Sequence, residues 1–267
     1  MKTTSPYLII LLLLVASCQK VVDWDFQTQD NAQLVVEAIL TDELIHQHIQ
    51  LSLSFSEWNG TAPTVSGAEV SVSDGQQSFP FVESSTEAGI YRSEQPFAVQ
   101  QNTRYQLSIQ WNGQTYTAQS EAVGIFPIPP IQFQSVGTDS LTIKEAAPPY
   151  SFFEQAMYQI DIDWTHLVPA DASRARQFFY TLSTVDANEL IRPTQESVVF
   201  PKGSILVETK YALNPEFAAY IRALLLETAW QGGVFDENSS SLPSNILPDG
   251  LGFFAVCATH RDTLVAE

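Results

Sequence analysis

The chain has 267 residues, of which 45% are hydrophobic and 16% charged, so it holds enough apolar material for a sizeable core. Acidic residues number 30 against 12 basic ones, which gives a formal net charge of -18. Nucleic acids and anionic lipids both bind through clustered Lys and Arg side chains. This composition therefore argues against nucleic acid as a partner and against adsorption to a membrane by a basic patch.

Residues 1–17 have the features of a secretory signal peptide, with Lys2 as the positive charge and an apolar run over Leu8–Ala16. Nine residues rise about 14 Å as a helix, whereas the hydrocarbon core of a bilayer is about 30 Å thick. We therefore expect a cleaved leader and not a membrane span.

The leader ends in Val15-Ala16-Ser17-Cys18, which resembles the lipobox of bacterial lipoproteins. This resemblance implies that Cys18 carries acyl chains and becomes the mature N-terminus; the alternative is an ordinary signal peptide with a coincidental Cys. Gln19 follows in place of the Asp that retains lipoproteins at an inner membrane, which points to the outer membrane and leaves open which face. We expect residues 18–32 to form a lipidated tether that reaches at most about 45 Å. Cys257 then has no intramolecular disulfide partner.

Residues 33–125 alternate short apolar runs with turn residues, as expected for a β-sandwich of immunoglobulin-like or transthyretin-like build. The clearest hairpin has Asn112-Gly113 as a type I′ turn, and Asp74-Gly75 suggests a second. The seven predicted strands are Leu34–Leu40, Ile45–Phe55, Ala68–Ser73, Gln77–Phe81, Ile90–Ser93, Arg104–Trp111 and Thr115–Glu121.

Three prolines within Phe126–Ile131 favour an extended connector, so we place a domain boundary there. Residues 126–267 are predicted to form an α+β domain. Asn214 and Pro215 predict the start of its one clear amphipathic helix, and Gly232-Gly233 its end. The apolar stripe of this helix is Phe217, Tyr220, Ile221, Leu224 and Leu225, and the further predicted strands are 158–164, 177–184, 196–200, 205–213 and 252–259.

Short segments spread over nearly the whole mature chain resemble a family of Bacteroidota outer-membrane lipoproteins known as domain of unknown function 4249. These segments are Cys18-Gln19-Lys20, Leu34-Val35-Val36-Glu37-Ala38, Val65-Ser66-Gly67-Ala68-Glu69-Val70, Gly89-Ile90-Tyr91, Tyr105-Gln106-Leu107-Ser108-Ile109, Ser244-Asn245-Ile246 and Gly250-Leu251-Gly252-Phe253-Phe254. Members are typically encoded beside TonB-dependent receptors, so the resemblance implies an accessory role at an outer-membrane transporter. Many relatives carry a Cys pair in the second half, which this chain lacks.

His46 and His48 are weak candidates for a metal site, because residues i and i+2 of a strand point to the same face. No third ligand is evident, and the alternation also fits a solvated polar face, so no metal or cofactor is predicted. Asp161 and Asp163 alternate with apolar residues in the same way. Cys257 is expected to be buried and inert, pointing away from His260.

Trp58, Trp111 and Tyr116 are weak candidates for an exposed aromatic platform that binds sugars or a receptor, although large aromatic side chains usually fill a sandwich core. No signature of a serine hydrolase, zinc peptidase or dinucleotide enzyme occurs. We therefore expect a non-catalytic accessory lipoprotein of a TonB-dependent receptor, with a surface binding module or adhesin for glycan or peptide as the alternative. A glycosidase-like pair of carboxylates has no local signature and stays open as a third class.

Overall fold

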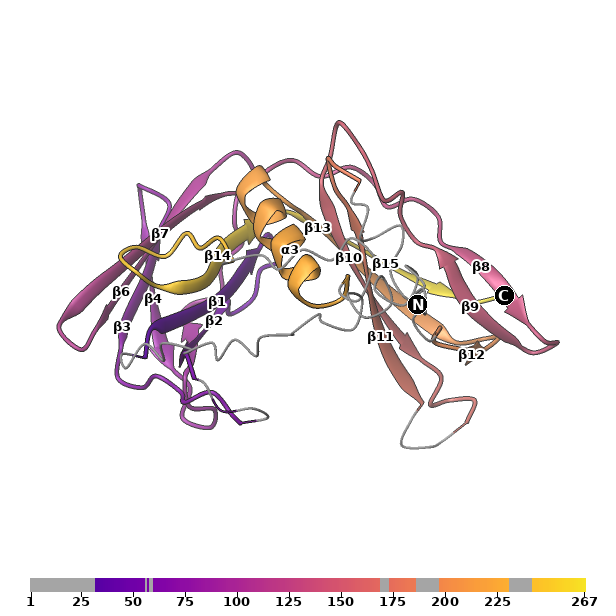
Figure 1. The fold of residues 1–267 in the computed structure, drawn as a ribbon, viewed down its shortest axis with the longest axis horizontal. Coiled ribbons are helices and arrows are strands. Elements are labelled where there is room, and N and C mark those ends of the chain that lie inside the picture. The colour runs from indigo at the N-terminus through magenta and orange to yellow at the C-terminus, as the bar shows by residue number, and fades with distance from the viewer. Residues whose placement is uncertain (1–31, 56, 58–59, 169–172, 186–196, 231–241) are drawn as a thin grey trace, which may run out of the picture. The chain divides into compact units, whose positions relative to one another are not determined.

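The computed structural model describes residues 32–55, 57, 60–168, 173–185, 197–230 and 242–267. The first sheet has eight strands in the order β14-β1-β2-β5-β4-β3-β6-β7 (Figure 1). Its first seven strands in chain order are β1 Leu34–Thr41, β2 His48–Leu53, β3 Glu69–Ser73, β4 Ser78–Glu83, β5 Ile90–Ser93, β6 Arg104–Trp111 and β7 Gln114–Glu121. All seven strands predicted in this part of the chain are confirmed, although β2 is shorter than expected.

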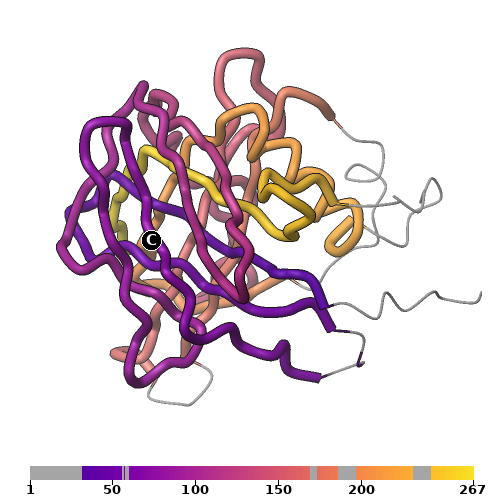
Figure 2. The backbone as a smooth tube through the Cα atoms, turned by 90° about the vertical axis from the view of Figure 1, so that its left-hand side faces the viewer, coloured from indigo at the N-terminus to yellow at the C-terminus, as the bar shows by residue number. Residues whose placement is uncertain are grey.

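The last strand of the first sheet comes from the other end of the chain. β14 (Leu251–Cys257) pairs in parallel with β1, and the two strands are the yellow and indigo segments of the tube in Figure 2. In this register Val36 lies beside Gly252. On its other side β14 meets β7, where the Val256 amide donates to the Ser120 hydroxyl at 3.1 Å. The sheet therefore curls until its two end strands meet. Residues 33–125 supply only seven of its eight strands, and the boundary at residue 126 stays a prediction.

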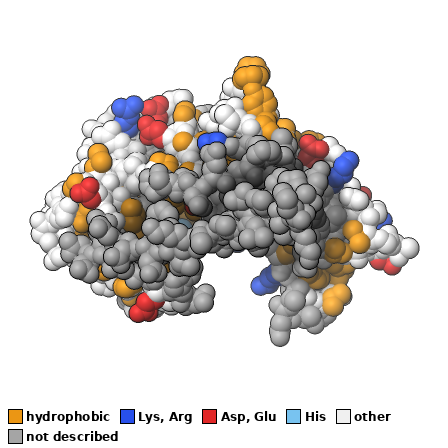
Figure 3. Space-filling view, in the orientation of Figure 1, with side chains coloured by type: hydrophobic (Ala, Val, Ile, Leu, Met, Phe, Trp, Pro, Cys, Tyr) orange, Lys and Arg blue, Asp and Glu red, His pale blue; other side chains and the backbone are white. Residues whose placement is uncertain are grey.

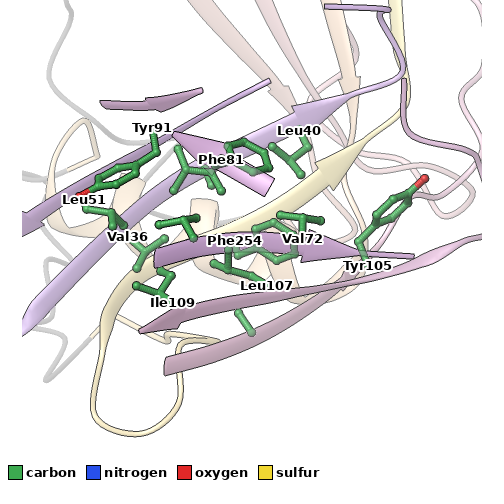
Figure 4. Close-up of a cluster of buried hydrophobic side chains, with 14 of the residues drawn as sticks. Val36, Leu40, Leu51, Val72, Phe81, Tyr91, Tyr105, Leu107, Ile109 and Phe254 are labelled. Atoms are coloured by element: carbon green, nitrogen blue, oxygen red, sulfur yellow. The ribbon is translucent and has the colours of Figure 1, made fainter. Parts of the chain in front are cut away.

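The curled sheet encloses an apolar core, shown in Figure 4. Val36, Leu51, Leu107 and Phe254 are among its fully buried members. The alternation seen in the sequence explains this, because successive side chains of a strand point to opposite faces. β14 contributes Phe254 and Val256 to this core and Phe253, Ala255 and Cys257 to a second one.

Turn chemistry at two positions fixes the hairpins. Asn112 and Gly113 have φ of 50° and 76°, which confirms the predicted type I′ turn between β6 and β7. At the second predicted turn Gly75 has a positive φ and Asp74 does not, so the type I′ prediction is wrong there. The Asp74 carboxylate instead accepts the amides of Gln76 and Gln77 at 2.8 and 2.7 Å, which stabilises a different turn.

The rest of the chain forms two smaller sheets in the orders β11-β10-β13-β15 and β12-β9-β8. Their strands are β8 Gln132–Val136, β9 Ser140–Glu145, β10 Ala156–Asp163, β11 Arg174–Thr181, β12 Phe200–Pro201, β13 Ile205–Ala212 and β15 Thr259–Val265. Strands β8, β9 and β15 were not predicted, because their apolar residues are few or follow a proline-rich stretch. The described chain is thus mainly β in a sandwich-like arrangement of sheets, as predicted.

The helix α3 (Pro215–Glu227) begins where the sequence indicates. The Asn214 side chain accepts the Phe217 amide at 2.9 Å and Pro215 occupies the first turn. The helix buries Phe217, Ala218, Ile221 and Leu225 against β14, while Tyr220 and Leu224 are half-buried. It ends at Glu227 and not at Gly232-Gly233, because the Thr228 amide turns back to the Leu225 carbonyl. No helix within the described ranges is both long enough and apolar enough to cross a bilayer.

Candidate functional site

A cleft of about 530 Å³ lies beside the proline connector. We call it the aromatic cleft. It is lined by Gln101, Val123, Gly124, Ile125, Phe126, Phe152, Phe153, Glu154, Gln155, Ser183, Leu213 and Pro215. The lining comes from five separate stretches of chain, which the fold brings together where the connector leaves the first sheet.

Three phenylalanines form the rim of the aromatic cleft and face water. Phe126, Phe152 and Phe153 are 56%, 81% and 89% exposed. The Phe152 ring packs edge-on against Tyr150, with centroids 4.9 Å apart. Figure 3 shows a knob of hydrophobic side chains at the loop that leads into β10. Large apolar side chains gathered in water mark interaction sites in soluble proteins.

A buried ion pair holds the two walls of the cleft together. Lys210 on β13 is 1% exposed, and its Nζ donates to Glu154 Oε2 at 2.7 Å. The same ammonium donates to the carbonyls of Phe126 at 3.0 Å and Pro127 at 3.4 Å. Glu154 Oε1 in turn accepts the Phe126 amide at 3.0 Å. The connector and the loop before β10 are therefore fastened to one cation.

The loop that carries Phe152 and Phe153 is also held at its base. The Ser151 hydroxyl accepts the amides of Phe153 and Glu154 at 3.2 and 3.3 Å. The Ser151 amide donates to the Leu182 carbonyl at 3.0 Å, and the Leu182 amide to the Pro149 carbonyl at 3.1 Å. The exposed rings thus stand on a turn with defined backbone bonds.

The chemistry that the aromatic cleft offers is binding. Its one carboxylate, Glu154, is neutralised by Lys210, and its remaining lining side chains are apolar or uncharged. The Gln155 Oε1 is already used by the amide and hydroxyl of Ser183 at 3.2 and 3.0 Å. Apolar walls with a few fixed polar groups suit an apolar or aromatic ligand.

Another cavity, of about 400 Å³, lies at the start of α3 and has carboxylates in its lining. It is lined by Glu121 and Glu216 among others, and Glu121 is paired with Arg104 at 3.3 Å. The non-catalytic expectation stays a prediction, as does the third class of a carboxylate hydrolase.

The two histidines that the sequence singled out lie on the solvated face of the first sheet. Both are exposed; His46 precedes β2, and its Nδ1 lies 2.7 Å from the Ser93 carbonyl. Burial and the nearby Arg92 lower the pKa of His48. Among the described residues no group of three or more His, Cys, Asp or Glu side chains is arranged to hold a metal ion.

The predicted aromatic platform is not assembled from the described members. Tyr116 is 8% exposed and belongs to the core of the first sheet, with Trp111 packed partly against it. Tyr116 lies opposite Ile109 on β6, which turns its ring inward. Trp58 and the lipidation residue Cys18 fall outside the described residues. The most exposed aromatic side chains among the described residues are instead the three phenylalanines of the cleft rim.

The remaining candidates behave as their strand positions predict. Asp161 and Asp163 lie on the wet face of β10 and pair with Arg176 and Arg174. Hydrogen bonds from the Thr165 hydroxyl and amide and from Arg174 lower the pKa of Asp163 to about 2. Cys257 is fully buried and burial raises the pKa of its thiol, so it is not an activated nucleophile.

The predicted strand 252–259 is divided, because β14 ends at Cys257 and the exposed His260 lies on the next strand, β15. The two residues therefore do not share one strand.

Sequence reasoning missed Lys210 and Glu154. The signal in the sequence is weak, because Lys210 shares its buried face of β13 with Glu208 as well as with Leu206 and Ala212. A lysine at such a position needs an anionic partner, but only the fold identifies Glu154, 56 residues away, as that partner.

No curated protein matches the chain. Among solved structures, the crystal structure of the FN1–FN3 domains of chicken CNTN1 is similar over 67% of this chain and 60% of that one. Its sequence identity is 12% and its TM-score 0.27. A model of one protein family matches residues 19–263, nearly the whole described body. The chain therefore belongs to the family described as a domain of unknown function, DUF4249.

Proposed function

We propose that this protein is a non-catalytic accessory lipoprotein of the outer membrane, which binds or presents a ligand beside a TonB-dependent receptor. The observation that carries the proposal is the aromatic cleft, with three exposed phenylalanines above a neutralised ion pair. Such a surface offers apolar contact area and no activated group. It suits recognition better than chemical conversion.

The leader supports the place that we propose for the protein. Val15-Ala16-Ser17-Cys18 has the spacing of a lipobox, and Gln19 is compatible with sorting to the outer membrane. Two or three acyl chains on Cys18 hold a protein on a bilayer far longer than one chain does. Such an anchor raises the effective concentration of the aromatic cleft beside a membrane receptor. The Bacteroidota lipoproteins that the sequence resembles are encoded beside such receptors.

The test is recovery of the receptor from the native envelope. The full chain with a C-terminal tag is cross-linked in cells, solubilised in detergent and purified, and its partners are identified by mass spectrometry. We expect an outer-membrane TonB-dependent receptor among them, and a strong reduction for Cys18→Ala. A native chain that carries no acyl group, or that recovers no such receptor, contradicts the proposal.

A surface binding module for glycan or peptide is the second candidate, and the phenylalanine rim favours it because aromatic faces stack on apolar ligand faces. The two candidates differ in what the mature chain binds alone. The mature chain with Cys18→Ser is tested on a glycan or peptide array. Binding that is lost when Phe126→Ala is added supports the surface binding module. The matched control is Val136→Ala, which removes an exposed apolar side chain outside the cleft lining.

A further inference from the structure

The loop before β10 exposes two of the largest apolar side chains of the molecule to water. Phe152 and Phe153 are adjacent in sequence and more exposed than any other large hydrophobic residue described. Isolated exposed apolar residues need no explanation, but two neighbouring phenylalanines at a projecting tip do. We call this tip, residues 150–153, the phenylalanine tip.

The phenylalanine tip is built to keep the two rings outside. The Ser151 hydroxyl accepts the amides of Phe153 and Glu154, and the buried Lys210 holds the next residue, Glu154, at 2.7 Å. Tyr150 packs edge-on against Phe152 and braces it. Backbone bonds and an ion pair therefore fix the turn from which the two rings extend into solvent.

Charge distinguishes between the surfaces that such a tip can enter. The phenylalanine tip carries no ionisable group except the Tyr150 hydroxyl, and the carboxylate behind it is paired with Lys210. The whole chain has a net charge of -18, which repels anionic lipid headgroups. An uncharged tip on an acidic body fits a zwitterionic lipid interface, where aromatic rings insert without electrostatic help.

Chain length places a bilayer within reach. Residues 19–31 lie between the proposed acyl anchor at Cys18 and the first described residue, Ala32. Fully extended, that stretch spans at most about 45 Å, so the body stays close to the membrane that holds its anchor. We propose that the phenylalanine tip is a second membrane contact, which inserts Phe152 and Phe153 into the interface of a zwitterionic bilayer and leaves Phe126 and the walls of the aromatic cleft for the ligand.

The test uses the mature chain from residue 18 with Cys18→Ser, so that no acyl group contributes. Its binding to phosphatidylcholine vesicles is measured by co-sedimentation, and we expect measurable partition that persists in high salt. In the double variant Phe152→Ser/Phe153→Ser, partition falls at least about tenfold, because two apolar side chains leave the interface. Thermal unfolding of this variant stays unchanged, since both rings are exposed.

A matched control removes two exposed apolar side chains elsewhere. In Leu44→Ser/Val82→Ser, which changes residues that are 74% and 52% exposed, partition stays within about twofold of the parent. In Phe153→Trp, brominated lipid quenches the added fluorescence. An unlipidated parent that does not bind vesicles, or a double variant that binds equally well, overturns the proposal.

Two other binding partners of the phenylalanine tip, a second copy of the chain and the receptor, would give different results in this test. If the double variant keeps vesicle binding but dissociates a dimer on size exclusion, the tip contacts a second copy and the proposal fails. If the variant keeps vesicle binding but loses receptor recovery, the tip contacts the receptor and the proposal fails again. The vesicle assay contains neither acyl chains nor receptor, so its outcome does not depend on the proposed accessory function. The inference rests on that proposed function only for the tether to the membrane.

Discussion

The eight-stranded sheet and the four-stranded sheet bury different kinds of side chain. Inside the first, the core consists of apolar residues and tyrosines, and the hydroxyl of Tyr91 donates to the Val65 carbonyl at 2.9 Å. On the second, β13 places two ionisable residues, Glu208 and Lys210, below 3% exposure. Apolar alternation thus suffices to specify the first sheet, whereas the second also depends on where single charges find partners.

The largest expected effect comes from removing the buried cation. Lys210→Met leaves the half-buried carboxylate of Glu154 without a counterion and two connector carbonyls without a donor. We expect a loss of about 3–5 kcal/mol in the free energy of unfolding, measured by urea denaturation at pH 7. The double variant Lys210→Met/Glu154→Leu recovers much of it, because neither charge is then stranded.

The exposed pair of Arg104 and Glu121 is the control for that variant, and Arg104→Met costs less than about 1 kcal/mol. A Lys210→Met variant that is as stable as the Arg104 variant contradicts the role assigned to the buried cation.

The second prediction concerns the link between the two ends of the chain. Gly252 has φ of 80°, and a Cβ there would lie 2.1 Å from the Val36 carbonyl oxygen on β1. Gly252→Ala therefore pushes β14 off the first sheet, and we expect a loss on the order of 3 kcal/mol. Gly113→Ala isolates the backbone effect, because Gly113 has a similar φ with open space around it, and costs about 1 kcal/mol. Equal losses in the two variants exclude a steric clash at Gly252.

The third prediction uses the other buried ionisable group of β13. Burial, and then the nearby Asp262, raises the pKa of Glu208 from 4.5 to about 7, and its Oε1 has no hydrogen-bond partner. Between these two values the folded state keeps a proton that the unfolded state has lost. Stability therefore falls as pH rises from about 4.5 to 7, by about 1.4 kcal/mol per pH unit at most, and is constant above.

The measurement is the difference between the parent and Glu208→Gln, which cancels the other carboxylates. We expect this variant to gain stability over the parent as pH rises from 5 to 8. A difference that stays flat across this pH range means that Glu208 is ionised throughout.

The strands β1 to β7 were predictable from sequence because apolar and polar residues alternate along them and the turn at Asn112 and Gly113 uses local chemistry. The start of α3 was predictable for the same reason, since Asn214 and Pro215 act within one turn. Pairing between distant strands is a different problem. Nothing in the pattern of β14 distinguishes pairing with β1 from pairing with its neighbours along the chain.

The candidate site was the least predictable part of the molecule, because it is formed by residues that are far apart in the sequence. Phe126, Phe152 and Phe153 are unremarkable in a chain with 16 phenylalanines. The long-range bonds of Lys210 to Glu154 and to the connector hold the segments that carry these rings. The platform predicted at Trp58, Trp111 and Tyr116 is not formed by its described members, since Tyr116 is buried in the core of the first sheet.

The smallest expected loss of stability is at Asp161, on the exposed face of β10, and it is compared with Ile160 on the buried face. Asp161 is half-exposed and pairs with Arg176. Burial raises the pKa of Asp161, but hydrogen bonds from Arg176 and Gln159 outweigh burial, so the pKa lies below 3.8. The pair therefore stabilises the fold above pH 3.8, and this contribution is lost as pH falls through the lowered pKa. Asp161→Asn costs less than about 1 kcal/mol at pH 7 and less still at pH 2, by urea unfolding. Ile160→Ala, on the buried face, costs about 2–5 kcal/mol at both pH values, because a cavity does not titrate. Equal costs at the two positions would mean that β10 does not have one wet and one dry face.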